Sequence, residues 1–276
     1  MVTVLLDPGH GGTDGGAGSA PYLEKTRNLE VASKVRDYLL ANFTVNVIMS
    51  RTTDKTVSLD ARTNLANQER VDYFLSIHHN SGTPSARGYE DFTYINISDT
   101  STSDRIRNAI HTEVVNRVLG KYGLPNRGKK KANFHVVRES NMPSALLEIG
   151  FVTNASDQQL IANPAFYNDV AVAIGEGVAK GLNLTRKKSP TTTPTLAPSP
   201  STPSKTMYRV QVGAYKERTN ATAMQTRLKS AGFPTVLSTS NGIYRVQIGA
   251  YGDKDNATAM EKRVRSAGFP VFVYTV

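Results

Sequence analysis

The stretch VTVLLDPGHGG at residues 2–12 decides the fold of the first part of the chain. An apolar run followed at once by Asp, Pro and Gly is typical of a short buried strand that ends in a turn. Strand-like and helix-like segments then alternate up to residue 184. This alternation predicts an α/β domain whose helices cover both faces of one sheet. Ligands in such sheets bind beyond the carboxyl ends of the strands, so the turn around His10 is the first place to look for a site.

Hydrophobic periodicity predicts the remaining elements of this domain. Apolar residues at helical spacing predict helices around residues 29–39, 59–66, 103–120 and 164–181. Apolar or alternating runs predict further strands at 45–50, 73–79, 88–95 (as part of a hairpin), 134–138 and 144–151. The expected fold class is therefore α/β, a three-layer arrangement with one sheet between two layers of helices.

The composition of the 276-residue chain excludes several classes of protein and site. There is no cysteine, so disulfides, thiolate metal sites and cysteine nucleophiles are excluded, and any metal must be held by His, Asp or Glu. No run approaches 18 apolar residues, which predicts that nothing spans a membrane. The first residues lack a basic region followed by a long apolar segment, so we expect synthesis in the cytoplasm without a signal peptide.

The net charge of +10 is confined to the end of the chain. Residues 1–185 hold 19 Lys/Arg and 19 Asp/Glu, whereas residues 186–276 hold 14 and 4, which gives 14 − 4 = +10. No nucleic-acid recognition motif accompanies this charge, so a nucleic-acid binder is the weakest interpretation.

A segment rich in Pro, Thr and Ser, TRKKSPTTTPTLAPSPSTPSKT at 185–206, predicts an extended linker. An internal repeat follows it. The 30 residues from Tyr208 recur from Tyr244 with 18 identical positions, and each copy has the pattern strand, helix, strand. Two such βαβ halves predict a small α+β domain with an open sheet and two helices on one side.

The repeat also predicts where its two helices begin and end. Asn220 and Asn256 are the predicted N-caps. Gly232 and Gly268 are expected to end the helices, because glycine adopts the left-handed backbone found just after a helix.

Polar residues at the ends of predicted strands indicate the chemistry of the first domain. His10 follows the first strand, His78 lies near the end of YFLSIHHN, and Glu148 lies within SALLEIGF. Glu24 lies in the loop before the first predicted helix. Two histidines and one carboxylate match a catalytic zinc shell whose fourth position is left to water. Zinc lowers the pKa of such a water to about 7. A second carboxylate must then accept the water proton and pass it to the leaving amine.

The residues alone leave alternatives open at each position. His78 and His79 point to opposite faces of a strand, so only one of them can face a site. Glu24 and Glu30 are both candidates near the first helix. The turn around His10 could be structural, and Glu148 could belong to a buried salt bridge. His111 and His135 are interpreted as structural, although His135 could line a pocket.

In this order, the motifs of residues 1–184 resemble the zinc-dependent N-acetylmuramoyl-L-alanine amidases. The resemblance implies that His10, Glu24 and His78 bind zinc and that Glu148 is the catalytic carboxylate, and so favours Glu24 over Glu30 and His78 over His79. Asn80 and Arg51 match recurrent motif positions and are expected to contact substrate. The motifs are DPGHGG (7–12), EKTRNL (24–29), SRTTD (50–54), SLDARTNLAN (58–67), SIHHN (76–80) and MPSALLEIGFVTN (142–154).

Residues 207–276 resemble the SPOR domain, a peptidoglycan-binding module. The repeated strand YRVQ-[VI]-GAY and the helix exit SAGFP carry the resemblance. It implies that the open face of the sheet contacts glycan strands. The glutamines alternate with Val and Ile and are expected to face solvent or ligand, whereas the tyrosines could be packing residues. The candidate glycan-binding residues are Gln211, Tyr215, Gln247, Tyr251, Arg209 and Arg245.

The two resemblances together imply a peptidoglycan hydrolase with a catalytic domain (1–184), a linker (185–206) and a wall-binding domain (207–276). Its expected reaction is cleavage of the amide between the muramic acid lactyl group and L-alanine by a zinc-activated water, with Glu148 transferring the proton. Anionic wall polymers are further expected partners of the basic tail. A non-catalytic wall-binding protein and a zinc carboxypeptidase acting within the stem peptide are the alternatives. A start without a leader fits a lysis enzyme of a prophage or of a sporulating mother cell, and it also fits an exported enzyme written without its leader.

Overall fold

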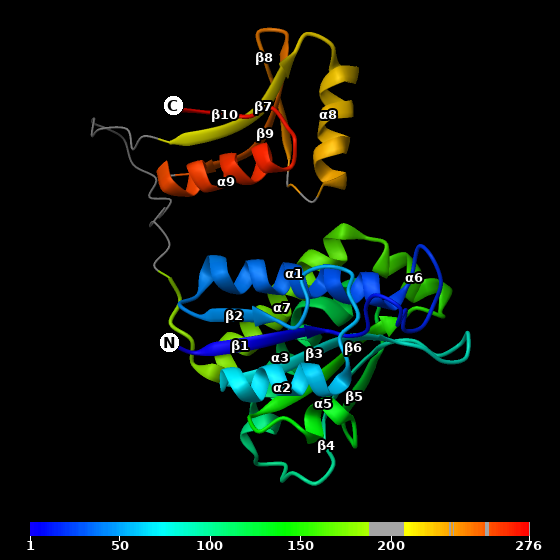
Figure 1. Ribbon diagram of the computed structural model, residues 1–276. Helices are drawn as coiled ribbons and strands as arrows, with labels where there is room; N and C mark the ends of the chain where they lie inside the picture. Colours follow the sequence, from blue (N-terminus) through cyan, green and yellow to red (C-terminus); the bar gives the residue numbers. More distant parts are fainter. Residues whose placement is uncertain (188–206, 232, 234, 252–253, 276) are drawn as a thin grey trace, which may run out of the picture. The chain divides into compact units, whose positions relative to one another are not determined.

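The computed structural model describes residues 1–187, 207–231, 233, 235–251 and 254–275. The chain divides into two compact units, residues 1–192 and 193–276. Each unit has its own sheet, with six strands in the first and four in the second (Figure 1). The linker predicted at 185–206 falls almost entirely outside the described residues.

The first unit is built on a mixed sheet with the strand order β2-β1-β3-β6-β4-β5. β1 pairs in parallel with β2 and β3, and β3 pairs in parallel with β6, so the carboxyl ends of these four strands meet at one edge. β4 runs antiparallel to β6, and β5 runs parallel to β4. The strands are β1 (Thr3–Pro8), β2 (Asn46–Met49), β3 (Tyr73–Asn80), β4 (Tyr89–Tyr94), β5 (Asn126–Ala132) and β6 (Ser144–Phe151).

Helices cover both faces of this sheet, and α1 and α2 lie on opposite faces (Figure 1). A π-helical turn (η1, Val115–Leu119) continues α3 into α4. The helices are α1 (Glu24–Asn42), α2 (Leu59–Glu69), α3 (Thr102–Val114), α4 (Gly120–Tyr122), α5 (His135–Arg138), α6 (Ala155–Ile161) and α7 (Pro164–Leu182).

The two faces of the sheet belong to two separate cores. The larger core joins alternate strand residues such as Leu75 and Leu147 to α1, α3 and α7. The smaller core joins the intervening residues, such as Phe74 and Leu146, to α2 and α5. Successive side chains of a strand point to opposite faces, so each strand contributes to both cores. We call the face under α1, α3 and α7 the packed face, and the face under α2 and α5 the site face.

The structure confirms the α/β class and most predicted elements, but it corrects two of them. The predicted strand 134–138 is wrong, because residues His135–Arg138 form the helix α5. Val136 and Val137 are both buried there, as one turn of helix can arrange against β4 and β6. Segment 88–95 is a strand, but its partners are β6 and β5, so the predicted hairpin is also wrong.

Two elements of the first unit have no counterpart in the sequence prediction. The strand β5 has the sequence NRGKKKA, which carries no apolar alternation. Its strand geometry comes from pairing with β4 at the edge of the sheet. The other is the short helix α6, whose N-cap Asn154 accepts hydrogen bonds from the backbone N–H groups of Ser156 and Asp157.

The second unit is an antiparallel sheet with the order β10-β7-β9-β8 and two helices that both pack on β7 and β9. One core joins the helices to the strands, which confirms the α+β prediction. Its elements are β7 (Tyr208–Tyr215), α8 (Arg218–Ser230), β8 (Val236–Ser240), β9 (Ile243–Tyr251), α9 (Lys254–Ser266) and β10 (Phe272–Thr275).

The predicted starts of the two helices are wrong, and one predicted end is confirmed. α8 begins at Arg218 with Glu217 as its N-cap, and α9 begins at Lys254, so Asn220 and Asn256 lie inside the helices. Gly268 follows α9 with a φ of +80°, as predicted. Gly232 lies outside the described residues.

None of the helices in the described ranges combines the length and the apolar character that a membrane crossing requires.

Candidate active site

The turn after β1 presents His10 at the carboxyl end of the sheet. His10 has a φ of +60°, in the left-handed region that side chains rarely adopt. The preceding Gly9 packs directly on the His78 ring, since a Cβ at Gly9 would lie 2.1 Å from His78 Cε1. The turn therefore requires glycine at this position, and it brings His10 against the end of β3.

Two buried arginines hold this turn in its conformation. Arg62 donates from Nη1 to Pro8 O and to Asp7 Oδ1, and from Nη2 to His10 O at 2.8 Å. Arg51 donates to the carbonyls of Pro8, Gly9 and Lys25 at 2.7–3.0 Å. Arg51 is only 1% exposed. The structure thus gives Arg51 a role in positioning the turn in place of the predicted contact with substrate.

Glu24 is the first residue of α1 and joins the two histidines. Its Oε1 lies 3.2 Å from His10 Nε2 and 2.9 Å from His78 Nδ1. Its Oε2 accepts a hydrogen bond from Ala17 N at 2.8 Å. The side chain is 5% exposed. One potential ligand atom from each of His10, Glu24 and His78 lies within 4.8 Å of the others, so the structure brings together the three residues that the motifs single out.

The electrostatics of this cluster favour an ionised carboxylate. Burial by itself would raise the pKa of Glu24, but the hydrogen bonds with His10 and His78 outweigh burial and hold its pKa far below the usual range. The hydrogen bond with Glu24 in turn raises the pKa of His10, against the opposing effect of burial. The cluster therefore offers one negative charge to whatever binds between the histidines.

The three residues fit a zinc ion. Two imidazole nitrogens and a carboxylate oxygen are a donor set that zinc prefers. A tetrahedral zinc about 2.0–2.2 Å from each donor needs donor atoms roughly 3.3 Å apart. The two distances from Glu24 Oε1, 2.9 and 3.2 Å, are close to this value. His10 Nδ1 lies 2.8 Å from Asp14 Oδ2, which is the carboxylate contact that commonly orients a ligating histidine.

Glu148 stands beside this cluster on the neighbouring strand. It is the direct partner of His78 in the pairing of β3 with β6, so both side chains lie on the site face. Its Oε2 is buried and has no hydrogen-bond partner among the described residues. Burial, together with the nearby charges of Glu24 and Glu90, raises the pKa of Glu148 well above the usual value. A carboxylate of this kind is a stronger base than an exposed one.

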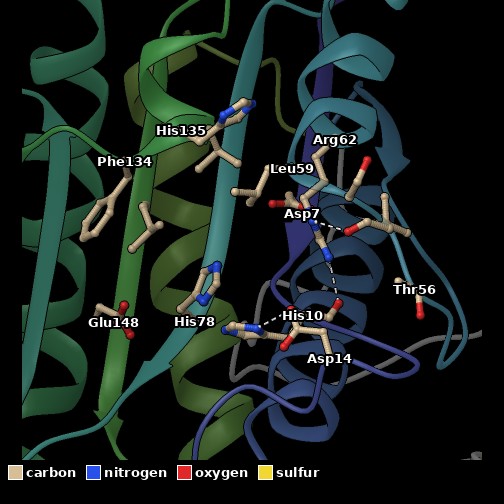
Figure 2. Close-up of a pocket in the computed structure, with 14 residues that line it drawn as sticks. Asp7, His10, Asp14, Thr56, Leu59, Arg62, His78, Phe134, His135 and Glu148 are labelled. Carbon is tan, nitrogen blue, oxygen red and sulfur yellow. Dashed lines mark hydrogen bonds and ion pairs between the residues drawn. The ribbon is translucent and has the colours of Figure 1, made fainter.

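A cavity of about 410 Å³ opens onto these groups. Figure 2 shows His10, His78 and Glu148 at one end of it, with Phe134, His135 and Leu59 toward the other. Val136 and Leu146 of the smaller core also line it. A pocket with an apolar wall and a few convergent polar groups is typical of a site for a small part of a larger substrate.

The structure excludes the competing histidine and glutamate from this cluster. His79 lies on the packed face, 1% exposed, between Asn28 Oδ1 at 2.8 Å and the Tyr167 hydroxyl at 3.0 Å. Burial lowers the pKa of His79 to about 3, so its ring is neutral. Glu30 pairs with Arg27 at 2.9 Å, away from the cluster.

The two histidines interpreted as structural differ in their surroundings. The Nδ1 of His111 lies 2.6 Å from Asp91 Oδ2 in the buried layer under α3. His135 lines the cavity, as the sequence allowed, and its Nε2 lies 3.2 Å from Asp60 Oδ1.

The remaining predicted site residues are Asn80 in the first unit and the six candidate glycan-binding residues in the second unit. Asn80 donates to Glu90 Oε1 at 2.6 Å and accepts from Ser81 N, so its amide already has protein partners. Gln211 and Gln247 are 4% and 9% exposed, so the expectation that they face solvent is wrong. Gln247 donates to the Tyr274 hydroxyl at 2.7 Å. The other candidates, Arg209, Tyr215, Arg245 and Tyr251, are partly exposed, and glycan binding by this set stays a prediction.

Three residues of the site were missed in the sequence. Asp14 contacts His10, and Asn28 donates to Gly9 O at 3.2 Å and to Glu24 Oε1 at 3.3 Å. Asn28 lies one helical turn after Glu24 within EKTRNL, and this spacing could have identified it. The third residue, Glu90, is the direct partner of Glu148 in the pairing of β4 with β6. No local signal reveals it, because its strand is distant in sequence.

Comparison with known proteins agrees with this geometry. The family model for N-acetylmuramoyl-L-alanine amidases matches residues 4–180, and the SPOR domain model matches residues 204–275. The chain is 36% identical to the N-acetylmuramoyl-L-alanine amidase CwlM of Bacillus licheniformis, over 86% of this chain and 85% of that protein. It is 37% identical to the sporulation-specific N-acetylmuramoyl-L-alanine amidase of Bacillus subtilis (strain 168), over 86% and 84%.

A solved structure shares the fold of the first unit. The catalytic domain of the N-acetylmuramoyl-L-alanine amidase CwlV from Bacillus (Paenibacillus) polymyxa var. colistinus superposes with a TM-score of 0.61 and 34% identity. The match covers 67% of this chain and the whole of that domain. The extent of the family match and these identities confirm both resemblances inferred from the motifs. The chain belongs to the N-acetylmuramoyl-L-alanine amidase family.

Proposed function

We propose that the first unit is a zinc amidase in which His10, Glu24 and His78 hold the metal and Glu148 is the catalytic base. The substrate is peptidoglycan, and the bond cleaved is the amide between the muramic acid lactyl group and L-alanine. The observation that carries the proposal is the placement of the buried, unpartnered Glu148 Oε2 beside the His10–Glu24–His78 cluster at the end of one cavity. This placement supports a metal site and a catalytic base that act together.

Each residue of the site has a separate task in this reaction. His10, Glu24 and His78 supply two neutral nitrogens and one negative oxygen to the metal. Bound zinc would polarise the scissile carbonyl and lower the pKa of a water to about 7. Glu148, whose side chain lines the cavity, takes a proton from the attacking water, and its buried Oε2 has no hydrogen bond within the described residues that would compete. It then delivers that proton to the L-alanine nitrogen as the carbon–nitrogen bond breaks, which leaves a lactyl carboxylate and a free peptide amine.

The second unit keeps the enzyme on its substrate. Its family resemblance and its basic charge support binding to glycan strands and to anionic wall polymers. Such tethering raises the local concentration of scissile bonds without a new contact at the active site. The enzyme therefore acts at the cell wall, and we propose that it arrives there after release or lysis.

The test is mass spectrometry of purified cell walls digested with the full chain, with and without a chelator. Free stem peptides with a new L-alanine amino terminus are expected; chelator should abolish their release and added zinc should restore it. Release of fragments cut within the stem peptide would instead indicate a carboxypeptidase or endopeptidase. Binding to walls without any release would indicate a wall-binding protein, and the catalytic role of Glu148 would be lost.

A further inference from the structure

The edge strand β5 carries four cations in five residues, and the proposed reaction uses none of them. They are Arg127, Lys129, Lys130 and Lys131. Alternation divides Lys129, Lys130 and Lys131 between the two faces of the sheet. A shift in the pairing between Tyr89 and Asp91 places one extra residue in β5, so Arg127 and Lys130 contact the same residue, Glu90. Lys130 pairs with Phe92 on the site face. Lys129 pairs with Asp91, whose side chain contacts His111 of α3 on the packed face.

Glu90 on β4 links two of these cations to Glu148. It is the strand partner of Glu148, and its carboxylate accepts hydrogen bonds from the cations. Glu148 on β6 is the direct partner of Glu90 on β4. Arg127 Nε donates to Glu90 Oε2 at 2.8 Å, and Lys130 Nζ donates to the same oxygen. The side chains of Glu148, Glu90, Arg127 and Lys130 therefore share the site face. Neighbouring strands lie about 4.8 Å apart, so the cations lie two strands, or about 10 Å, from Glu148.

The two cations that contact Glu90 keep unused binding capacity. They share one oxygen of a single carboxylate, and Asn80 already occupies the other oxygen of Glu90. Within the described ranges, Arg127 Nη1 and Nη2 donate no hydrogen bond. The guanidinium carbon lies 4.9 Å from the centre of the Phe151 ring, which fixes its plane. The side chains of Arg127 and Lys130 are 35% and 38% exposed, so a ligand can reach them.

We propose that Arg127 and Lys130 form a subsite for a free carboxylate of the stem peptide, on the leaving-peptide side of the scissile bond. This inference rests on the proposed function. The guanidinium fork of arginine matches a carboxylate, which it can bind through two parallel hydrogen bonds. An extended peptide advances about 3.3 Å per residue, so a span of about 10 Å from the scissile bond reaches the second or third residue of the stem. The pair thereby selects stems whose carboxylate at that place is not amidated.

The alternative ligand, a phosphate of an anionic wall polymer, is less consistent with this location. A polymer that only tethers the enzyme can bind anywhere on its surface. These cations instead lie in the same row as Glu148, at a distance that a group covalently attached to the scissile bond can span.

The experiment uses the full chain with zinc and three synthetic muramoyl tripeptides. One has a free carboxylate only at the second residue, one only at the third, and one has both amidated. We expect wild type to prefer one of the two carboxylates over the fully amidated substrate by about tenfold in kcat/KM, mainly through KM, as for a partly exposed charge-assisted contact. Arg127→Gln and the double variant Arg127→Gln/Lys130→Gln should reduce that preference to near one. Lys129→Gln removes the same charge from the packed face and should keep the preference; zinc content is measured for every variant.

The outcomes separate this inference from the function on which it rests. Wild type that cleaves none of the three substrates and no cell wall contradicts the proposed function itself. Equal cleavage of all three by wild type, or an unchanged preference in the double variant, overturns the subsite alone. Equal rates on the three peptides, combined with weaker wall hydrolysis by the double variant, would assign the cations to an anionic polymer.

Discussion

The two faces of the six-stranded sheet differ in what they leave unpartnered, and two adjacent histidines show the difference. His79 on the packed face has both ring nitrogens within hydrogen-bond distance of buried side chains, and burial keeps it neutral. His78 on the site face lies at the carboxyl end of the parallel strands, where it contacts Glu24 and lies near His10. One residue of displacement along β3 thus changes a structural histidine into a candidate metal ligand.

Two glutamates, Glu113 and Glu148, show the same difference between the two faces. Glu113, in α3 on the packed side, is held by Arg117 and Lys180, so its charge is neutralised. Glu148 on the site face has a buried oxygen without any partner in the part of the chain that the structure describes. A buried polar group without a partner destabilises a fold. We interpret its retention at the end of a cavity as a sign of chemistry there.

The strongest test of this difference between the two faces replaces each of the two histidines by alanine in turn. His78→Ala should lose zinc and all measurable hydrolysis, because only His10 and Glu24 then remain to hold the ion. His79→Ala should retain one zinc per chain. Metal analysis after dialysis, with circular dichroism to check folding, measures both. Zinc loss in His79→Ala with an intact fold would contradict the assignment of the two faces.

The next test removes the unpartnered charge and leaves the metal ligands untouched. Glu148→Gln keeps the side-chain volume but cannot accept a proton, so turnover of muramoyl peptides should fall by about 10³-fold or more, with zinc content unchanged. Mass spectrometry of released peptides and metal analysis give the two readings. Residual turnover above about a tenth of wild type would remove Glu148 from the reaction.

A smaller loss of zinc affinity is expected from Asp14, which contacts the ligand His10 and not the metal. Asp14→Asn weakens the orientation of His10 but leaves all three ligands in place, so zinc affinity should fall by about 10–100-fold. Competition with a chelator of known affinity measures the change. Glu30→Gln, which alters a carboxylate of α1 outside the cluster, is the control and should leave the affinity unchanged.

The smallest effect on function belongs to the packed face, where the expected change is in stability. His79→Ala leaves a cavity and removes the partners of Asn28 and Tyr167, which should lower the free energy of unfolding by about 2–4 kcal/mol. Denaturant unfolding of the zinc-loaded protein measures this. If turnover per folded molecule fell with it by more than about tenfold, the two faces would be less independent than we infer.

The sequence predicted the fold class from local periodicity, and the order of its motifs, through the family resemblance, implied the candidate ligand set. DPGHGG and SIHHN each place a histidine directly at the end of a strand, and the ends of parallel strands meet at one edge of a sheet. Predictions failed where contacts are long-range. The edge strand β5 has no apolar pattern and forms through pairing with β4, and 134–138 became a helix because two adjacent valines are both buried.

By itself, the sequence determined that the chain has an α/β domain and a repeated basic domain, and its motifs singled out the histidines and glutamates that we propose carry the chemistry. Composition, periodicity and motif order are properties of the chain alone. Only the tertiary structure decided that Arg51 supports the His10 turn, that Gln211 and Gln247 are buried, and that Glu90 and the cations of β5 lie in one row with Glu148. The reason is physical: partners across a sheet are chosen by strand order and register, which join residues far apart in sequence.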